Sequence, residues 1–293
     1  MKNLKIFLFL YLMLLGCKKD DLNPGLEGFN IIINNKVVLS NNDIEHYDFS
    51  SHLIYLYDTN AFNHQLNYQD NFFVYANGQE IYQGQFTPAL TTVLSVPYIT
   101  ASNYYSANIV PINFMRILDD AGNQVNDDPR GDSRIVSVLK EFHKYHPGLE
   151  CHLKSVSYVS ENDVTAEIEI FNPDSYDYFI PDPDKMGLSL YHFFTYGLFF
   201  NNYNPPTFYF NNIETESPQP ANTWKMEWIT LIKSNETKTF TIHYDNFDAL
   251  APGQYEARFN FFGLNVDMDY LELPEGRIWQ GFFMTEPFPV TIN

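Results

Sequence analysis

Short runs of β-forming residues, each closed by turn residues, extend through most of the sequence. The run Phe72–Tyr75 is followed by Asn77-Gly78 and then by Glu80–Tyr82. Asn-Gly between two apolar runs is a strong hairpin signal, because both turn positions favour positive φ. With a similar run at Leu53–Tyr57, this pattern predicts one all-β domain over residues 28–118.

A single clear amphipathic helix is predicted after this domain. A polar, acidic stretch begins at Asp119. Four apolar residues then recur at helical spacing: Ile135, Val138, Leu139 and Phe142. Pro147-Gly148 ends the pattern. We therefore expect residues 119–148 to form an acidic linker that carries one helix.

Alternating strand patterns return after the helix. His152–Val159 and Val164–Phe171 flank a polar turn. The segment Leu250–Tyr255 resembles the tyrosine corner of immunoglobulin-like sandwiches, in which a tyrosine hydroxyl bonds the backbone just upstream. This resemblance implies a β-sandwich over residues 149–293. The expected fold class is mainly β, with two β-sandwich-like domains joined by a short segment containing one helix.

The N-terminus has the layout of a secretory signal peptide. Lys2 and Lys5 precede a short apolar stretch, Ile6–Leu15, and small residues follow it. A membrane span needs roughly 20 apolar residues, about twice the length of this stretch. We therefore expect residues 1–16 to be removed.

The end of the leader, Leu14-Leu15-Gly16-Cys17, resembles the lipobox of bacterial lipoproteins. The resemblance implies that Cys17 becomes the first mature residue and carries fatty acyl chains such as palmitate. Lys18, Lys19, Asp20 and Asp21 resemble the export tag of Bacteroidota surface lipoproteins. This implies an outer-membrane protein on the extracellular face, held by a lipidated tether over residues 17–27.

Charge and cysteine content narrow the classes of partner. The formal net charge of the chain is −19, and Lys and Arg together number 17. Nucleic-acid binding needs concentrated basic residues, so no nucleic-acid partner is expected. Once Cys17 carries lipid, Cys151 has no partner for a disulfide, and we expect it to be a small buried apolar residue.

No sequence motif of a hydrolase, a phosphate loop or a dinucleotide site is present, so no catalytic residue is expected. The densest set of potential metal ligands is His143, His146, Glu150, Cys151 and His152. Their spacing fits no standard zinc pattern, which favours a histidine-rich helix end. We therefore expect no metal site and no cofactor other than the covalent lipid.

Acidic residues of two loops have the oxygen ligands that calcium prefers. They are Asp119, Asp120, Asp127, Asp128 and Asp132 in the first loop, and Asp182 and Asp184 in the second. The EF-hand spacing is not met, so solvated acidic loops are the favoured interpretation over calcium sites.

Aromatic residues are concentrated in the segments 192–203 and 208–210. Neither a strand nor a helix period is clean there, and a buried strand with a packed loop is the favoured interpretation. The alternative is an exposed aromatic platform for a protein or a glycan. Its candidate contact residues, with two tryptophans added, are Phe194, Tyr196, Phe199, Phe200, Tyr203, Trp224 and Trp228.

These observations predict a non-enzymatic lipoprotein anchored in the outer membrane. We expect an accessory or scaffold subunit of an outer-membrane β-barrel complex for transport, export or protein insertion. The main alternative is a glycan-binding surface lipoprotein, and a weaker one is a peptidase-inhibitor-like module.

Overall fold

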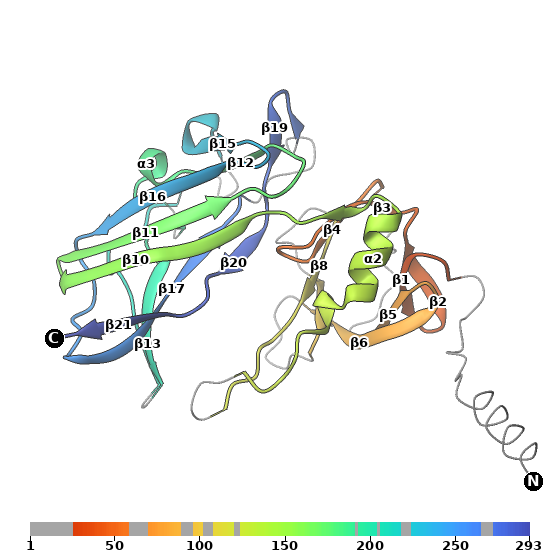
Figure 1. The fold of residues 1–293 in the computed structure, drawn as a ribbon, viewed down its shortest axis with the longest axis horizontal. Coiled ribbons are helices and arrows are strands. Elements are labelled where there is room, and N and C mark those ends of the chain that lie inside the picture. The colour runs from red at the N-terminus through yellow and green to blue at the C-terminus, as the bar shows by residue number, and fades with distance from the viewer. Residues whose placement is uncertain are drawn as a thin grey trace, which may run out of the picture.

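The computed structural model describes residues 26–58, 70–88, 96–101, 108–119, 124–190, 193–203, 206–217, 224–264 and 272–293. These residues are mainly β strand and form several sheets in two lobes (Figure 1). The mainly β, sandwich-like fold expected from the sequence is confirmed. Within the described ranges, no helix has both the length and the apolar character needed to cross a bilayer.

One nine-stranded sheet forms most of the N-terminal lobe. Its strands are β1 (Phe29–Ile33), β2 (Lys36–Ser40), β3 (Ile44–Asp48), β4 (Leu53–Leu56), β5 (Asn71–Ala76), β6 (Gln79–Pro88), β7 (Tyr98–Ala101), β8 (Ile109–Asn113) and β9 (Tyr145–His146). They lie in the order β2-β1-β5-β6-β7-β8-β4-β3-β9. The predicted hairpin is confirmed, because β5 and β6 pair antiparallel around Asn77 (φ 48°) and Gly78 (φ 77°).

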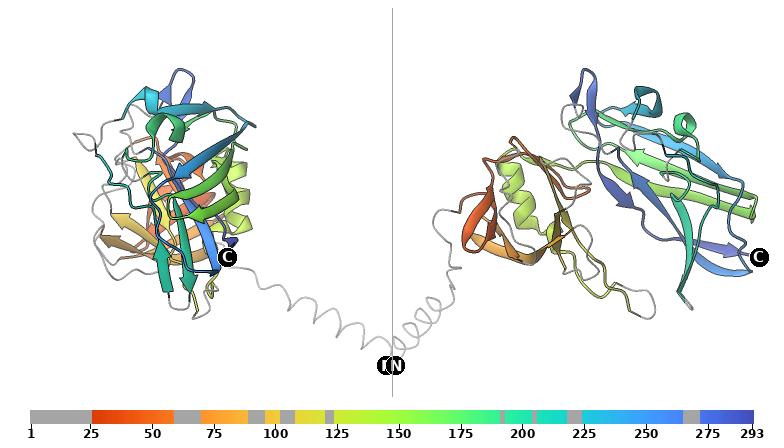
Figure 2. Two further views of the ribbon diagram at one scale, coloured as in Figure 1. Left: turned by 90° about the vertical axis from the view of Figure 1, so that its left-hand side faces the viewer. Right: turned by 180° about the vertical axis from the view of Figure 1, so that it is seen from behind.

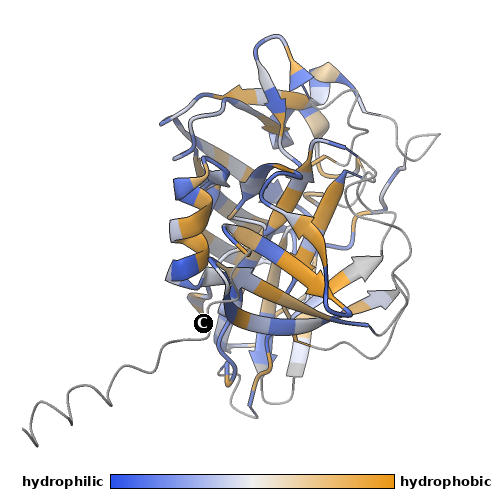
Figure 3. Ribbon diagram, turned by 90° about the vertical axis from the view of Figure 1, so that its right-hand side faces the viewer, coloured by the Kyte–Doolittle hydropathy of each residue, from blue (hydrophilic) through white to orange (hydrophobic). Residues whose placement is uncertain are grey.

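The predicted helix is present as α2 (Ser133–Glu141), after a short 3-10 turn, η1 (Pro129–Gly131). The Asp132 side chain accepts a hydrogen bond from the Arg134 N–H and caps the helix. Figure 3 shows hydrophobic residues in orange and hydrophilic residues in blue along this helix. Its buried side chains join the core of the N-terminal lobe: Ile135, Val138 and Leu139.

The segment expected as a linker therefore belongs structurally to the N-terminal lobe. Helix α2 packs on this lobe, and β9, which follows it, pairs in parallel with β3. The apolar side of α2 needs a surface to cover it, and the N-terminal sheet provides that surface.

Three sheets form the C-terminal lobe. The first has β10 (Glu150–Ser160), β11 (Asp163–Phe171) and β16 (Thr237–Tyr244), in that order. The second has the order β14 (Pro206–Tyr209), β13 (Leu198–Tyr203), β17 (Gly253–Phe262) and β20 (Phe282–Met284), with β21 (Phe288–Ile292) also on β17. The third has β15 (Ile229–Ile232), β12 (Tyr178–Pro181), β19 (Gly276–Ile278) and β18 (Glu272–Leu273). Two short helices accompany them, α3 (Pro183–Met186) and η2 (Met226–Trp228).

The first two of these sheets enclose the core of the C-terminal lobe. Alternate residues of β11, such as Ile168, and of β17, such as Phe259, are buried in one cluster. The predicted tyrosine-corner hydrogen bond is present, since Tyr255 Oη donates to the Ala251 carbonyl oxygen at 2.9 Å. This bond fixes the turn that leads into β17.

The two lobes share a buried apolar cluster and lie side by side (Figure 2). The N-terminal lobe contributes Leu53, Tyr55 and Ile109. The C-terminal lobe contributes Phe179, Ile229, Leu264 and Ile278. Because this surface is buried from water, separating the lobes would expose it, which opposes their separation.

Candidate functional site

The residues of the expected lipid anchor lie outside the described residues, which begin at Leu26. These anchor residues are Cys17 and the tag Lys18, Lys19, Asp20 and Asp21.

Most of the candidate aromatic contact residues are buried. Phe194 and Phe200 are in the core of the C-terminal lobe, and Trp228 is 8% exposed. Phe199 is 6% exposed on the opposite side of β13 from Phe200, because strand side chains alternate. These four side chains are therefore not available as an open platform.

The remaining three candidates differ in exposure. Tyr196 is 41% exposed at the surface. Trp224 is partly buried against two apolar clusters. Tyr203 is the last residue of β13, and its side chain lies outside the described part of the structure. The exposed aromatic surface is consequently smaller than the sequence alternative expected, and it includes Phe208 at 55% exposure.

The sheet β14-β13-β17-β20 has a face directed away from the core, which we call the outer face. Paired residues on neighbouring strands point to the same side of a sheet. The pairs on this side are Phe208 with Asn201, Asn201 with Glu256, Phe199 with Arg258, Asn260 with Met284, and Phe262 with Phe282. The outer face thus has a polar centre between aromatic residues.

Aromatic rings cluster at one end of the outer face. The rings of Phe208 and Phe210 have centroids 6.4 Å apart and planes 26° apart. Phe199 lies 5.9 Å from Phe210, and Tyr196 lies 6.3 Å from it. These rings cover a larger apolar surface than one residue could.

A second aromatic pair lies at the opposite end of the outer face. The rings of Phe262 and Phe282 have centroids 4.9 Å apart. Phe282 is 41% exposed. Apolar ring surface is therefore available at both ends of the polar centre.

The polar centre contains three acceptor oxygens that lack donors. Asn201 Oδ1, Glu256 Oε2 and Asn260 Oδ1 have no hydrogen-bond partner within the described part of the chain. Asn201 is 4% exposed. Arg258 Nη2 is 3.8 Å from Glu256 Oε2, which is an ion pair without a hydrogen bond. A buried acceptor without a donor costs about 1–3 kcal/mol, so these oxygens favour the approach of donors.

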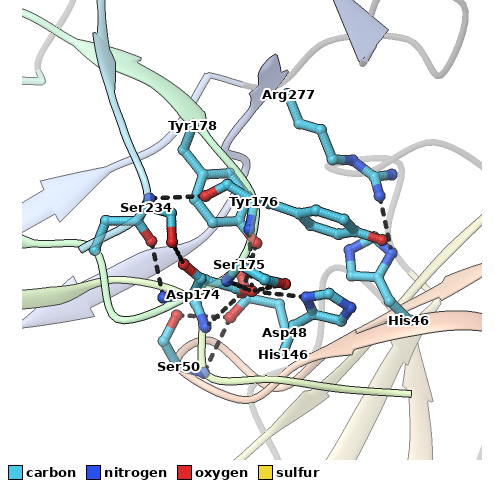
Figure 4. Close-up of polar contacts among 12 residues, drawn as sticks. His46, Asp48, Ser50, His146, Asp174, Ser175, Tyr176, Tyr178, Ser234 and Arg277 are labelled. Atoms are coloured by element: carbon cyan, nitrogen blue, oxygen red, sulfur yellow. Dashed lines mark hydrogen bonds and ion pairs between the residues drawn. The ribbon is translucent and has the colours of Figure 1, made fainter. Parts of the chain in front are cut away.

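The contact between the lobes, which we call the junction, contains a polar network that the sequence did not reveal (Figure 4). At its centre is the buried carboxylate of Asp174. Its Oδ1 accepts hydrogen bonds from His146 Nδ1 (2.8 Å) and the Ser175 backbone N (2.6 Å). Its Oδ2 accepts from Tyr178 Oη (2.9 Å) and the Gly148 backbone N (3.2 Å). Burial alone would raise the pKa of the Asp174 carboxyl. The hydrogen bonds from His146, Tyr178 and Gly148 outweigh burial and hold the pKa below its ordinary value.

A second buried carboxylate, Asp48, links the lobes directly. Its Oδ2 accepts from the indole Nε1 of Trp279 at 2.9 Å, and its Oδ1 accepts from Ser50 Oγ at 2.6 Å. Burial raises the pKa of Asp48 to about 6, although the bonds from Ser50, Ser51 and Trp279 lower it. In sequence, Asp48 before two serines indicates only a local turn, because Trp279 is 231 residues away.

The chain crosses between the lobes at Gly148, beside both carboxylates. Gly148 has φ +73°, and a Cβ placed there would lie 2.3 Å from Asp48 Oδ1 and 2.3 Å from Ser50 Oγ. Its backbone N donates to Asp174. Glycine therefore meets both a conformational and a steric requirement at this position.

A buried histidine and an arginine complete the junction. Arg277 Nη1 donates to His46 Nδ1 at 3.3 Å and lies 3.2 Å from Glu45 Oε1. Arg277 Nε lies 2.6 Å from Glu272 Oε1. The His46 ring stacks on Tyr55 with centroids 4.1 Å apart. Burial and the charge of Arg277 hold the pKa of His46 well below its ordinary value, so the ring is neutral.

In the junction, His146 connects two segments of the chain. His146 stacks on Tyr176 at 4.1 Å while it bonds Asp174. Among the residues that the structure describes, no serine or threonine hydroxyl is hydrogen-bonded to the other ring nitrogen of His146. The hydrogen bond between His146 and Asp174 joins β9 to the segment after β11.

The potential metal ligands noted in the sequence are dispersed. His143 and His152 are exposed, whereas His146 turns inward to Asp174. Burial raises the pKa of the Cys151 thiol to about 12. Over the described ranges, no group of three His, Cys, Asp or Glu side chains is placed to hold a metal ion.

The acids of the two candidate calcium loops have other partners. Asp128 bonds Arg130, Asp132 caps α2, and Asp182 caps α3. Asp119 also has a partner, Asp127 and Asp184 are exposed, and Asp120 lies outside the described residues.

A loop after β8 projects from the N-terminal lobe (Figures 1 and 2). We call residues 114–119 and 124–126 the projecting loop. The Val125 N donates to the Ile117 carbonyl at 2.9 Å, and the Ile117 N donates to Asn126 Oδ1 at 2.7 Å. Three of its aliphatic side chains are exposed: Ile117 at 46%, Leu118 at 45% and Val125 at 60%.

No family model matches the chain, and no curated protein matches it. Function is therefore inferred from the chain's own features: the projecting loop, the outer face and the junction.

Proposed function

We propose that this protein is a non-enzymatic lipoprotein of the outer membrane that acts by contact with another protein. Fatty acyl chains on Cys17 hold it on the extracellular face. The two lobes form one body, and the partner is an outer-membrane β-barrel protein whose complex handles transport, export or insertion.

The observation that carries this proposal is a group of exposed aliphatic side chains on the projecting loop. Ile117, Leu118 and Val125 are each about half exposed, although hydrogen bonds fix the loop that carries them. Grouped apolar side chains on a soluble surface commonly mark an interaction site. Their burial by a partner would contribute a few kcal/mol, since a full aliphatic side chain contributes roughly 1.5–3 kcal/mol.

The position of the loop supports a role in contact. Its described residues extend beyond the strands of its lobe (Figure 1), and Arg116 Nη2, next to Ile117 in the chain, lies 4.0 Å from Glu286 Oε1 of the C-terminal lobe. The net charge of the chain, −19, disfavours anionic lipid as the surface that covers these aliphatic side chains. A protein surface with an apolar recess fits these features better.

A pull-down from gently solubilised membranes tests the proposal. The test variant carries Ile117→Ser, Leu118→Ser and Val125→Ser. A matched control carries Val37→Ser and Val159→Ser, which change residues that are 47% and 71% exposed elsewhere. We expect the wild type and the control to retain an outer-membrane protein that the test variant loses. Recovery of the wild type as a lone monomer, or retention by the test variant, would contradict the proposal.

The anchor is tested separately with Cys17→Ser. We expect this variant to leave the membrane fraction, and protease treatment of intact cells to digest the wild-type protein. Sedimentation of Cys17→Ser with membranes, or protection of the wild type in intact cells, would contradict the proposed location.

A further inference from the structure

Three acceptor oxygens occupy the polar centre of the outer face without donors: Asn201 Oδ1, Glu256 Oε2 and Asn260 Oδ1. A ligand that satisfies them must bring hydrogen-bond donors. A ligand that is only apolar would leave them unpaired, and a phosphate group would bring further acceptors.

The separation of the acceptors excludes a small ligand that contacts all three. Asn201 is paired with Glu256, whereas Asn260 is four residues farther along β17. At about 3.3 Å per residue, that places Asn260 roughly 13 Å from Glu256. One metal ion cannot contact oxygens so far apart, so an extended ligand is required.

The aromatic ends of the outer face add a second requirement. Phe208, with Phe199 and Phe210, lies at one end, and Phe262 with Phe282 lies at the other. Phe208 and Phe282 are 55% and 41% exposed. A ligand with flat apolar faces stacks on such rings, while its polar rim reaches the acceptors between them.

The charge of the outer face indicates a neutral ligand. The carboxylate of Glu256 is balanced by the guanidinium of Arg258 at 3.8 Å. An anionic ligand would be repelled by the chain's net charge of −19. A chain of sugar rings combines hydroxyl donors, apolar ring faces, length and neutrality.

We propose that the outer face binds a neutral oligosaccharide. Its sugar rings stack on Phe208 and Phe282, and its hydroxyl groups donate to Glu256, Asn260 and Asn201. The acceptor oxygens of Asn201, Glu256 and Asn260 are all covered by neighbouring protein atoms in this structure. They reach the ligand by rotation about the terminal side-chain torsions, which are broad for Asn and Glu. This site shares no residue with the projecting loop and adds a ligand to the proposed protein contact.

Affinity electrophoresis of the full mature lipoprotein in detergent tests the proposal. The probes are soluble mannan, laminarin, xylan and starch, with heparin as an anionic comparison. We expect one of the neutral polysaccharides to retard the wild type, and heparin to leave its mobility unchanged. Mobility unchanged by every neutral probe, or retardation by heparin alone, would overturn the proposal.

Substitutions then locate the site. Phe208→Ala and Asn260→Ala are each expected to weaken binding at least tenfold, with thermal unfolding unchanged. Tyr57→Ala is the control, since Tyr57 is a 63% exposed aromatic residue of the other lobe. Full binding by Phe208→Ala and Asn260→Ala, or loss of a protein partner in place of the sugar, would overturn the assignment.

The projecting-loop variant separates this site from the proposed function. We expect Ile117→Ser, Leu118→Ser, Val125→Ser to lose the protein partner and keep polysaccharide binding. Loss of polysaccharide binding in that variant would show that the two surfaces are one site and would overturn the proposal of a separate one.

Discussion

The junction and the outer face both contain buried polar side chains, but they differ in whether the buried acceptor oxygens receive hydrogen bonds. At the junction, the two oxygens of Asp174 receive bonds from His146, Gly148, Ser175 and Tyr178. On the outer face, Asn201 Oδ1 receives none from the described residues. A saturated acceptor holds elements together, whereas an unsatisfied one is free to accept a ligand's donor.

The largest effect that tests this comparison is expected at the junction. Asp174→Ala would leave several buried donors without an acceptor, each at a cost of about 1–3 kcal/mol, so we expect a loss of at least about 3 kcal/mol. Urea unfolding with a fixed m value measures it. Asp163→Ala, at the exposed start of β11, is the control and should remain near wild type. A loss below about 1 kcal/mol for Asp174→Ala would show that the network is dispensable.

The next effect is the dependence of stability on pH. Burial is the largest cause of a lowered pKa at two histidines. It holds the pKa of His46 well below its ordinary value, and it lowers the pKa of His52 to about 3. Both rings therefore stay neutral in the folded state while the unfolded chain takes up two protons as the pH falls below about 6.5. The folded state takes up one proton in return, because burial raises the pKa of Asp48 to about 6.

The unfolded chain thus binds about one proton more than the folded state. The free energy of unfolding should therefore fall by about 1.4 kcal/mol for each unit by which the pH is lowered from about 6 to about 4. His46→Gln removes that excess and should flatten the profile over this interval. The exposed His243→Gln should keep the wild-type slope. Unfolding measured at several pH values decides the matter, and an unchanged slope in His46→Gln would contradict the neutral state of His46.

A smaller effect is expected at the tyrosine corner, which represents a saturated contact outside the junction. Tyr255→Phe removes the bond to the Ala251 carbonyl and should cost about 0.5–1.5 kcal/mol. Tyr75→Phe is the matched control, because the Tyr75 hydroxyl bonds Glu80 at the exposed surface. Equal midpoints of unfolding for the two variants would argue against a stabilising role for the corner.

The smallest effect on stability is expected at the outer face. Asn201→Val removes an acceptor that has no donor, so we expect a change within about 1 kcal/mol, in either direction, together with loss of polysaccharide binding. Asn172→Val is the matched control. Asn172 is equally buried but donates to the Tyr176 and Ile232 carbonyls and accepts from the Asp174 N–H.

We expect Asn172→Val to lose several kcal/mol, because it leaves three backbone groups unpaired. Similar losses for the two asparagine variants would erase the distinction between the junction and the outer face.

Local features of the fold could be predicted from the sequence because their causes are local. The turn at Asn77-Gly78, the apolar face of the helix and the tyrosine corner each depend on residues a few positions apart. The place of the helix was not predictable in the same way. Its apolar face indicates that something covers it, but the spacing does not say which sheet does.

The aromatic segment shows a second limit. Phe199 and Phe200 point to opposite sides because both lie within β13, where successive side chains alternate. The segment has no clean period, and element boundaries are the least reliable part of a sequence prediction, so the sequence did not indicate which rings face the core. The junction shows a third limit. His46 and Asp48 meet Arg277 and Trp279 across 231 residues, and no local pattern specifies that meeting.

The crossing at Gly148 restricts how far the two lobes can move relative to each other. A flexible linker would let the two halves swing, and whatever each held would then sample many separations. With the crossing fixed beside Asp48 and Asp174, the two lobes keep a constant separation and orientation. If a sugar chain and a protein partner bind to the two halves as proposed, they would be held at a constant distance and angle from each other.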